Sequence, residues 1–206
     1  YSATISACEK GARWHEAMGL FSDMLFRRVE LTVIAHNAAI SALGKGARWH
    51  EALGVVSDMK QRCLEPVVIT CNAAISACEM GARWHEALGI LWSMQLWRLE
   101  PNVITDTSAI SAFEKGAQWH AALGIFSDML SRSVEINVVA CTAAVSACGK
   151  GIRWREAIGM VLDMGLRCVE LGAIAYTAAI SACERGSRWQ EALDMTVAMR
   201  LRRLDP

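Results

Sequence analysis

The sequence predicts an all-α fold, an α-solenoid built from stacked helix-turn-helix repeats. Three observations carry this prediction. A tryptophan recurs every 35 residues, a glycine and a methionine keep the same period, and no insertion or deletion interrupts the pattern. The tryptophans are Trp14, Trp49, Trp84, Trp119, Trp154 and Trp189. Because one helix pair cannot bury both of its faces, successive pairs must stack on each other.

The repeat boundaries follow from this period. We expect a single repeat array over residues 1–206, with repeats at about 1–32, 33–67, 68–102, 103–137, 138–172 and 173–206. The chain opens at Tyr1 in the middle of the pattern. We therefore expect it to be a fragment of a longer protein, with any targeting segment outside it.

The repeat 33–67 shows what each element is. An alanine-rich stretch over 33–43 predicts a first helix, and Gly46 follows as its C-cap. A second helix is predicted over 48–59, where apolar residues at helical spacing form one stripe. The polar segment that follows contains Pro66 and cannot extend this helix. Each repeat is thus a first helix, a glycine turn, a second helix and a loop.

The two helices of a repeat differ in charge. Among the first-helix segments the only Asp, Glu, Lys or Arg is Asp106, whereas the second helices carry recurring Arg, Glu and Asp residues. These first-helix segments are 33–43, 68–78, 103–113, 138–148 and 173–183. A helix that is uncharged all round is covered on most sides. We therefore expect the first helices to line the inner, concave wall and the second helices to form the outer wall.

Composition excludes several classes of protein. The chain has 21 basic and 21 acidic residues and 53% hydrophobic residues, so it is neither disordered nor a bulk-basic nucleic-acid binder. Any positive charge that serves nucleic acid must be concentrated on one face. A membrane-spanning helix needs about 20 apolar residues, and no uncharged run in the chain reaches that length.

No set of catalytic or metal-binding residues appears, and the sequence predicts a non-enzyme without a cofactor. The pair His50–Glu51 and its equivalents lack the second histidine that a helical zinc site requires, because that position is Gly54. We expect Glu51 to pair with Arg48 on a solvated face. The cysteines Cys8, Cys78, Cys148 and Cys183 share one repeat position with Leu43 and Phe113, which favours small core residues and a reducing compartment.

The six repeated tryptophans have two interpretations. Aromatic side chains can stack on the bases of single-stranded RNA. They also recur with Ala and Leu on the same helical stripe, which favours packing between helices, and we adopt this interpretation. Trp92 and Trp97 break the pattern and could form an exposed patch for a protein partner.

The repeat resembles that of the pentatricopeptide repeat family over the whole chain. That family's repeat is similar to V-x-T-Y-N-x-L-I, a glycine turn, E-A-L-x-L-F-x-x-M and a loop ending in x-P-D. This chain carries Val68-Ile-Thr-Cys-Asn-Ala-Ala-Ile-Ser-Ala, then Glu86-Ala-Leu-Gly-Ile-Leu-Trp-Ser-Met, then Glu100-Pro-Asn. The tetratricopeptide repeat fits less well, since its period is about 34 residues and its tryptophan lies in the first helix. Two features depart from the family: Trp replaces the usual Leu that opens the second helix, and the common terminal Asp is absent.

The resemblance implies a right-handed superhelix that binds single-stranded RNA sequence-specifically, one base per repeat. It also implies a role in RNA processing, stability, editing or translation in the mitochondrion or chloroplast. The alternative function is a protein-binding helical scaffold within a larger assembly, and the neutral net charge slightly favours it. The chain carries no polar terminal caps, so we also expect end-to-end self-association.

The resemblance further implies which residues read the bases. In the family, a polar residue in the first turn of the first helix acts with the last residue of the same repeat. Here these pairs are Ser2 with Thr32, Asn37 with Val67, Asn72 with Asn102, Thr107 with Asn137 and Thr142 with Gly172; the last reader is Thr177. A short Ser or Thr leaves room for a purine and Asn suits a pyrimidine. The expected order of bases from 5′ to 3′ is purine, pyrimidine, C, A, purine, purine.

Two further sets complete the expected site. Family members hold each base between apolar side chains, which here are Ile34, Ile69, Ile104, Val139 and Ile174. Basic residues recur at the end of the first helices: Lys10, Lys45, Lys115, Lys150 and Arg185. Such cations stabilise a helix C-terminus. They would also form a ladder of positive charge that meets one phosphate per repeat, and both roles are compatible.

Overall fold

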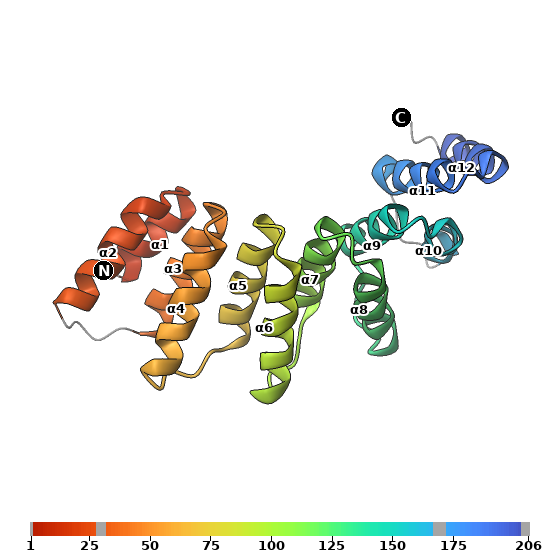
Figure 1. Ribbon diagram of the computed structural model, residues 1–206. Coiled ribbons are helices and arrows are strands. Elements are labelled where there is room, and N and C mark those ends of the chain that lie inside the picture. The colour runs from red at the N-terminus through yellow and green to blue at the C-terminus, as the bar shows by residue number, and fades with distance from the viewer. Residues whose placement is uncertain (1, 28–31, 167–171, 203–206) are drawn as a thin grey trace. The chain divides into compact units, whose positions relative to one another are not determined.

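The computed structural model describes residues 2–27, 32–166 and 172–202, which form twelve α-helices and no strand (Figure 1). The first helices are α1 (Ser2–Lys10), α3 (Val33–Lys45), α5 (Val68–Met80), α7 (Val103–Lys115), α9 (Val138–Lys150) and α11 (Ala173–Arg185). The second helices are α2 (Trp14–Phe26), α4 (Trp49–Gln61), α6 (Trp84–Leu96), α8 (Trp119–Ser131), α10 (Trp154–Leu166) and α12 (Trp189–Leu201). The predicted all-α helical-repeat solenoid is confirmed.

The first helices run two residues further than the composition of the segment 33–43 predicted. Lys45 is the last residue of α3, and the backbone N–H of Gly46 bonds to Ala42 O at 3.1 Å. The turn that follows is narrow, because only three residues separate α3 from α4. A basic residue in the last helical turn is favourable, since it faces the partial negative charge of the helix C-terminus.

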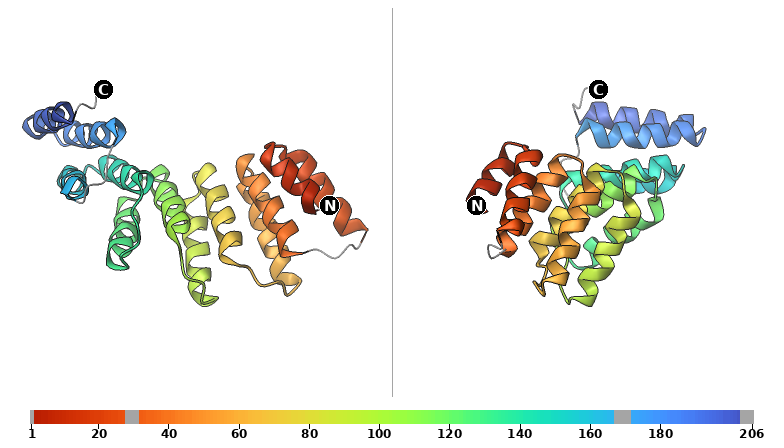
Figure 2. Two further views of the ribbon diagram at one scale, coloured as in Figure 1. Left: turned by 180° about the vertical axis from the view of Figure 1, so that it is seen from behind. Right: turned by 60° about the vertical axis from the view of Figure 1, so that its left-hand side comes forward.

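The chain divides into two compact parts, residues 1–112 and 113–206, each built from the same helix pairs. In the first part α3 contacts both α1 and α5, and α4 and α6 pack on α3 and α5 (Figures 1 and 2). In the second part α9 contacts α11, while α10 and α12 pack on α9 and α11. First and second helices thus form separate layers within each part. The single array over both parts stays a prediction.

The core lies between these layers. Ala39, Ile40 and Leu43 of α3 are fully buried, as is Met59 of α4. The repeated methionines of α2, α4, α6, α8, α10 and α12 are all buried, which explains their strict period. Cys78, Cys148 and Cys183 are buried as well, and they occupy the position that Leu43 fills in α3. The interpretation as small core residues is confirmed for these three cysteines, whereas Cys8, at the same position of α1, is only partly buried.

The glycine turns owe their glycine to packing rather than to backbone conformation. Gly46 has an ordinary negative φ of −84°, and the left-handed residue of the turn is Ala47, with φ 54°. A Cβ at Gly46 would lie less than 3.0 Å from the ring of Trp14 in the preceding repeat. Glycines 81, 151 and 186 meet the tryptophan of the preceding repeat in the same way. The sequence-based assignment of Gly46 as a C-cap was right in position but not in its physical reason.

An arginine of the next repeat also lies over the ring of four of the tryptophans. The guanidinium of Arg48 lies 4.6 Å from the centre of the Trp14 ring, and those of Arg83, Arg153 and Arg188 lie 4.4 Å from Trp49, Trp119 and Trp154. Trp189 of α12 is 67% exposed. Trp14, Trp49, Trp119 and Trp154 therefore pack between repeats as predicted, each against the glycine and the arginine of the next repeat.

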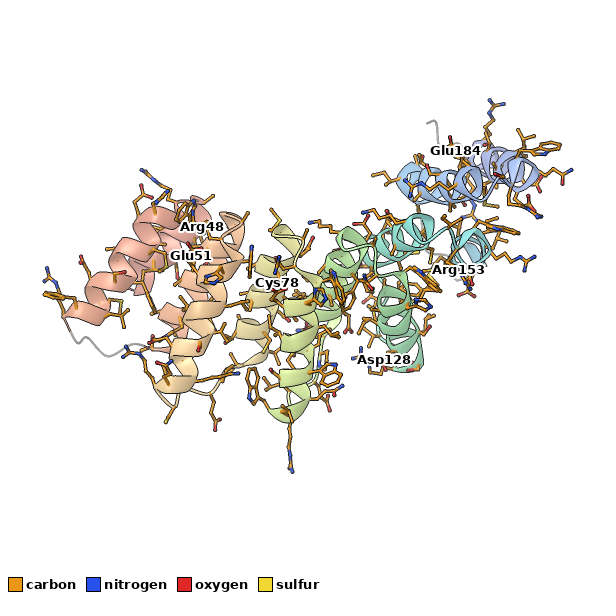
Figure 3. All side chains as sticks on the ribbon, viewed as in Figure 1. Arg48, Glu51, Cys78, Asp128, Arg153 and Glu184 are labelled. Carbon is orange, nitrogen blue, oxygen red and sulfur yellow. The ribbon has the colours of Figure 1, made fainter. Side chains whose placement is uncertain are left out.

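The charged outer face consists of short-range ion pairs. Arg48 pairs with Glu51, as the spacing of three residues predicts; both residues are labelled in Figure 3. Arg153 pairs with Glu156 at the same spacing. The hydrogen bond from Arg48 holds the pKa of Glu51 below its usual value. Trp92 is 68% exposed on this side, whereas Trp97 is half-buried beneath Lys60, whose Nζ lies 4.5 Å from the ring centre. Only Trp92 thus presents the open aromatic face predicted for both. Within the described residues no helix has the length and apolar character to cross a membrane.

Candidate nucleic-acid interface

A groove of about 540 Å³ lies on the first helices of the first part. It is lined by side chains at the same positions of successive helices: Ser6, Glu9, Ile34, Asn37, Ala38, Ser41, Ile69, Asn72, Ala73, Ser76, Ile104 and Ser108. Every one of these residues comes from α1, α3, α5 or α7. The prediction that the first helices form the concave wall is confirmed for this part of the chain.

The predicted base-sandwiching residues are exposed apolar side chains. Ile34, Ile69 and Ile104 line the groove and are 67%, 67% and 61% exposed. Val139 and Ile174 of the second part are 60% and 74% exposed. Five β-branched apolar residues at one repeat position contribute no burial energy to folding while they face water. Exposed apolar positions of this kind mark binding surfaces.

The predicted base-reading residues lie one helical turn further along the same helices. Asn37 and Asn72 line the groove beside the isoleucines. Thr142 and Thr177 are partly exposed on α9 and α11, and their hydroxyls donate to Val138 O at 2.7 Å and Ala173 O at 2.8 Å. Thr107 bonds to Val103 O at 2.6 Å in the same manner. Ser2 opens α1, but its side chain lies outside the described residues.

The second member of each predicted pair stands at the N-cap of the next first helix, and three of these residues cap it through their side chains. The Thr32 hydroxyl accepts from Ala35 N at 3.4 Å, and Asn137 Oδ1 accepts from Ala140 N at 2.7 Å. Asn102 Oδ1 accepts from Thr105 N at 3.0 Å. Gly172 also stands at an N-cap. Thr, Asn and Gly are favoured N-cap residues. Sequence reasoning missed this role, although the residue types before each first helix signal it.

Val67 is the exception among these caps. It carries no side-chain acceptor, and its own N–H donates instead to Thr70 Oγ1 at 3.2 Å. Among the predicted pairs within one compact part, Asn72 and Asn102 are joined directly, with Nδ2 of Asn72 3.3 Å from Oδ1 of Asn102. Thr107 and Asn137 belong to different parts, and their pairing stays a prediction.

The predicted basic ladder ties consecutive repeats together. Lys45 Nζ lies 3.0 Å from Glu9 O, Lys150 Nζ 3.0 Å from Glu114 O, and Arg185 Nη1 3.3 Å from Gly149 O. Each cation thus meets the C-terminal carbonyls of the preceding first helix, which its charge stabilises. Glu9 and Glu114 also accept from Ser41 and Ser146, both at 2.8 Å. Lys10 and Lys115 are exposed at the ends of α1 and α7. Phosphate contact by this ladder stays a prediction.

The two buried thiols of α5 are poor nucleophiles. Burial raises the pKa of Cys71 to about 11 and that of Cys78 to about 12. Since the thiolate is the reactive form, both are inert at neutral pH. Within the described residues no group of three His, Cys, Asp or Glu side chains is placed to hold a metal ion.

Comparison with known structures supports the fold. The crystal structure of the pentatricopeptide repeat protein PPR10 from maize matches with a TM-score of 0.77 at 20% identity, over 100% of this chain and 30% of that one. PPR10 in complex with an 18-nt psaJ RNA element matches 96% of this chain at 19% identity, with a TM-score of 0.77. The pentatricopeptide repeat domain of the Arabidopsis thaliana protein-only RNase P 1, in complex with tRNA, matches with a TM-score of 0.73 at 12% identity, over 92% of this chain and 96% of that one.

The chain spans less than a third of the length of PPR10. No curated protein sequence matches it. Two sequence families do match. Residues 19–83 and 54–116 match the pentatricopeptide repeat domain, and residues 1–29 and 174–204 match the PPR repeat. Together with the strict period and the glycine-capped helix pairs, these matches over more than half of the sequence show that the chain belongs to the pentatricopeptide repeat family.

Proposed function

We propose that the chain binds single-stranded RNA sequence-specifically and reads one base per repeat. The observation that carries this proposal is the groove, in which α3 and α5 each offer one exposed isoleucine and, one turn later, one asparagine. An apolar residue at each step can hold a base on its face, and the polar residue can meet the base edge. The RNA-bound structures of PPR10 and of the RNase P 1 domain support a nucleic-acid ligand for this fold.

The polar residues set the proposed order of bases. The readers Ser2, Asn37, Asn72, Thr107, Thr142 and Thr177 correspond to purine, pyrimidine, C, A, purine, purine from 5′ to 3′. Val67 and Gly172 end their repeats without a polar side chain, so the second and fifth positions discriminate weakly, as pyrimidine and purine respectively. Family membership favours an organellar RNA, in the mitochondrion or chloroplast, as the target.

Selection from a random RNA pool, followed by binding across a salt series, tests this function. RNA binding predicts an enriched motif and an affinity that falls as salt rises, because phosphate contacts release counterions. Absence of binding at low salt would overturn the proposal.

A protein-binding scaffold is the second candidate. The zero net charge and the engagement of Lys45 and Lys150 by neighbouring helix ends both reduce the charge available for phosphates. The exposed ring of Trp92 on the outer face is a suitable protein contact. If the chain is an RNA-binding protein, Trp92→Ser should leave RNA binding unchanged. If it is a protein-binding scaffold, Trp92→Ser should abolish binding of the protein partner.

A further inference from the structure

Two buried threonines contact the reading asparagine of the preceding repeat. Thr70 Oγ1 lies 2.7 Å from Asn37 Oδ1, and Thr105 Oγ1 lies 2.5 Å from Asn72 Oδ1. Both threonines are 0% exposed and come from the first turn of the next first helix. Neither position belongs to the reading pairs that the family resemblance implies.

The contact at Asn37 fixes which way its amide points. Thr70 Oγ1 accepts the N–H of Val67 at 3.2 Å, and its single proton is directed at Asn37 Oδ1. A buried hydroxyl proton needs an acceptor. The amide must therefore present its carbonyl oxygen to Thr70, which leaves the NH2 group of Asn37 for the groove.

The amide of Asn72 is fixed from two sides. Its Oδ1 meets the Thr105 hydroxyl, and its Nδ2 donates to Asn102 Oδ1 at 3.3 Å. Asn102 Oδ1 is itself an acceptor for the backbone N–H groups of Ile104 and Thr105, at 3.1 Å and 3.0 Å. The reverse orientation of Asn72 would place two carbonyl oxygens against each other. One N–H of Asn72 therefore remains for the groove.

The threonine readers have the opposite hydrogen-bonding polarity. The hydroxyl protons of Thr142 and Thr177 are used by carbonyls of their own helices, at 2.7 Å and 2.8 Å. The oxygen lone pairs of these hydroxyls remain, and lone pairs only accept. Asparagine readers thus offer donors to a base, and these threonine readers offer acceptors.

The sequence pairs each kind of reader with one kind of residue in the next repeat. The asparagine readers Asn37 and Asn72 are followed by Thr70 and Thr105, whereas the hydroxyl readers are followed by alanine at this position. These latter pairs are Ser2 with Ala35, Thr107 with Ala140 and Thr142 with Ala175. A hydroxyl reader that donates its proton to a carbonyl of its own helix needs no hydrogen-bond partner in the next repeat. An asparagine reader, whose amide reaches into the next repeat, needs such a partner.

We propose that Thr70 and Thr105 are positioning residues that set the donor polarity of the asparagine readers, and so help to specify pyrimidines. The proposal rests on the proposed RNA binding. A fixed N–H donor matches O2 or N3 of cytosine and O2 or O4 of uracil. An asparagine amide that is free to rotate would present its oxygen to the groove as easily as its NH2 group. That oxygen would accept a hydrogen bond from the amino group of a purine or of cytosine.

Thr70 offers the cleaner test, because Val67 supplies no second hydrogen bond to Asn37. We would measure the affinity of the 206-residue chain for four hexamers, 5′-ANCAAA-3′, that differ only at the second base. Thr70→Val removes the hydroxyl at nearly constant volume, and Thr70→Ser is the matched control that keeps it. We expect Thr70→Val to lower the affinity for the pyrimidine hexamers about 3- to 10-fold, as for the loss of one hydrogen bond, and to leave the purine hexamers unchanged. Thr70→Ser should keep the wild-type preference.

Two further variants extend the test. Thr105→Val should have a smaller effect at the third base, because Asn102 still orients Asn72. In the second part, Thr142→Asn combined with Ala175→Thr copies the Asn37–Thr70 arrangement and should move the fifth base towards pyrimidine. Thr142→Asn alone should give a weaker preference than the combination.

The outcomes separate this inference from the function on which it rests. A wild-type chain that binds none of the hexamers overturns both. A wild-type chain with a base preference that Thr70→Val leaves intact overturns the positioning role alone. If Thr70→Val and Thr70→Ser both lose the same affinity for all four hexamers, Thr70 has a merely structural role, and this result also overturns the positioning role. Circular dichroism confirms that each variant keeps its helices.

Discussion

At the scale of single residues, the glycines of this chain fall into two sets that differ in the space around them. Gly46 and Gly81 lie against tryptophan rings, and a Cβ there would meet the ring at less than 3.0 Å. Gly54 and Gly89 stand at a repeated position inside the second helices, and a Cβ there would meet nothing within 4 Å. Both sets keep the same period of 35 residues, so sequence alone does not tell them apart.

Alanine substitution should separate the two sets of glycines. Gly54→Ala and Gly89→Ala should each stabilise the chain by about 0.5–1 kcal/mol, since alanine is the better helix former. Gly46→Ala and Gly81→Ala should each destabilise it by about 1–3 kcal/mol, as overpacking does. Thermal unfolding of the four variants measures this. A lower melting temperature for Gly54→Ala and Gly89→Ala would contradict the account of these helix positions.

Thiol reactivity is the second residue-scale prediction. Burial raises the pKa of Cys141 and Cys148 to about 12, whereas Cys63 is exposed at the end of α4. Peptide mapping after brief alkylation at neutral pH should find Cys63 modified and Cys71, Cys78, Cys141 and Cys148 protected until the chain unfolds. Rapid modification of Cys78 in the folded chain would show that these thiols are not core residues.

At the scale of helices, sequence patterns predicted most of the structure and less of the site. The second helices begin at the repeated tryptophans as expected, because a stripe of apolar residues at helical spacing is unambiguous. The exposed isoleucines could also be placed from the family pattern. The double role of Asn102, as N-cap and as partner of Asn72, could not be predicted, since it depends on contacts between repeats rather than on periodicity.

The missing cap of α5 yields an element-scale prediction. Val67 stands at the N-cap with extended backbone and no side-chain acceptor, where Asn102 caps the equivalent helix α7. Val67→Asn should stabilise the chain by about 1 kcal/mol, the usual value of an N-cap side chain. Val67→Ala is the control and should bring no gain, and Asn137→Ala should cost about 1 kcal/mol. Equal unfolding midpoints for Val67→Asn and Val67→Ala would exclude the capping role.

At the scale of the whole molecule, the apolar and basic residues should affect RNA binding in different ways. Ile69→Ala with Ile104→Ala removes apolar surface from the groove, so RNA affinity should fall while the salt dependence stays constant. Substitution of Lys115 and Lys150 by Met should instead reduce the slope of log affinity against log salt by about one unit per lost phosphate contact. Binding titrations at four salt concentrations distinguish the two effects. Identical slopes in both variants would show that the assigned roles are wrong.

Self-association tests the interface that holds repeats together. In the 206-residue chain, Trp189 and Leu193 are exposed beside an open, largely apolar hollow on α11 and α12. The same tryptophan position in earlier repeats is covered by a glycine turn and an arginine. Light scattering should show mass that grows with concentration, and Trp189→Ser should reduce it. A monomer at all concentrations would contradict this expectation.

The most direct test of base reading is to substitute one base-reading residue and to determine whether the selected base changes at the matching position of the RNA. RNA selection from a random pool should be performed with the wild-type chain and with Thr107→Asn. The account predicts a selected adenine at the fourth position for the wild type and a pyrimidine there for the variant, with the other positions unchanged. It also predicts that the original RNA binds the variant less tightly by roughly 1–3 kcal/mol, the usual cost of one wrong base. If the selected RNAs keep adenine at that position after the substitution, this chain does not read bases through its first helices.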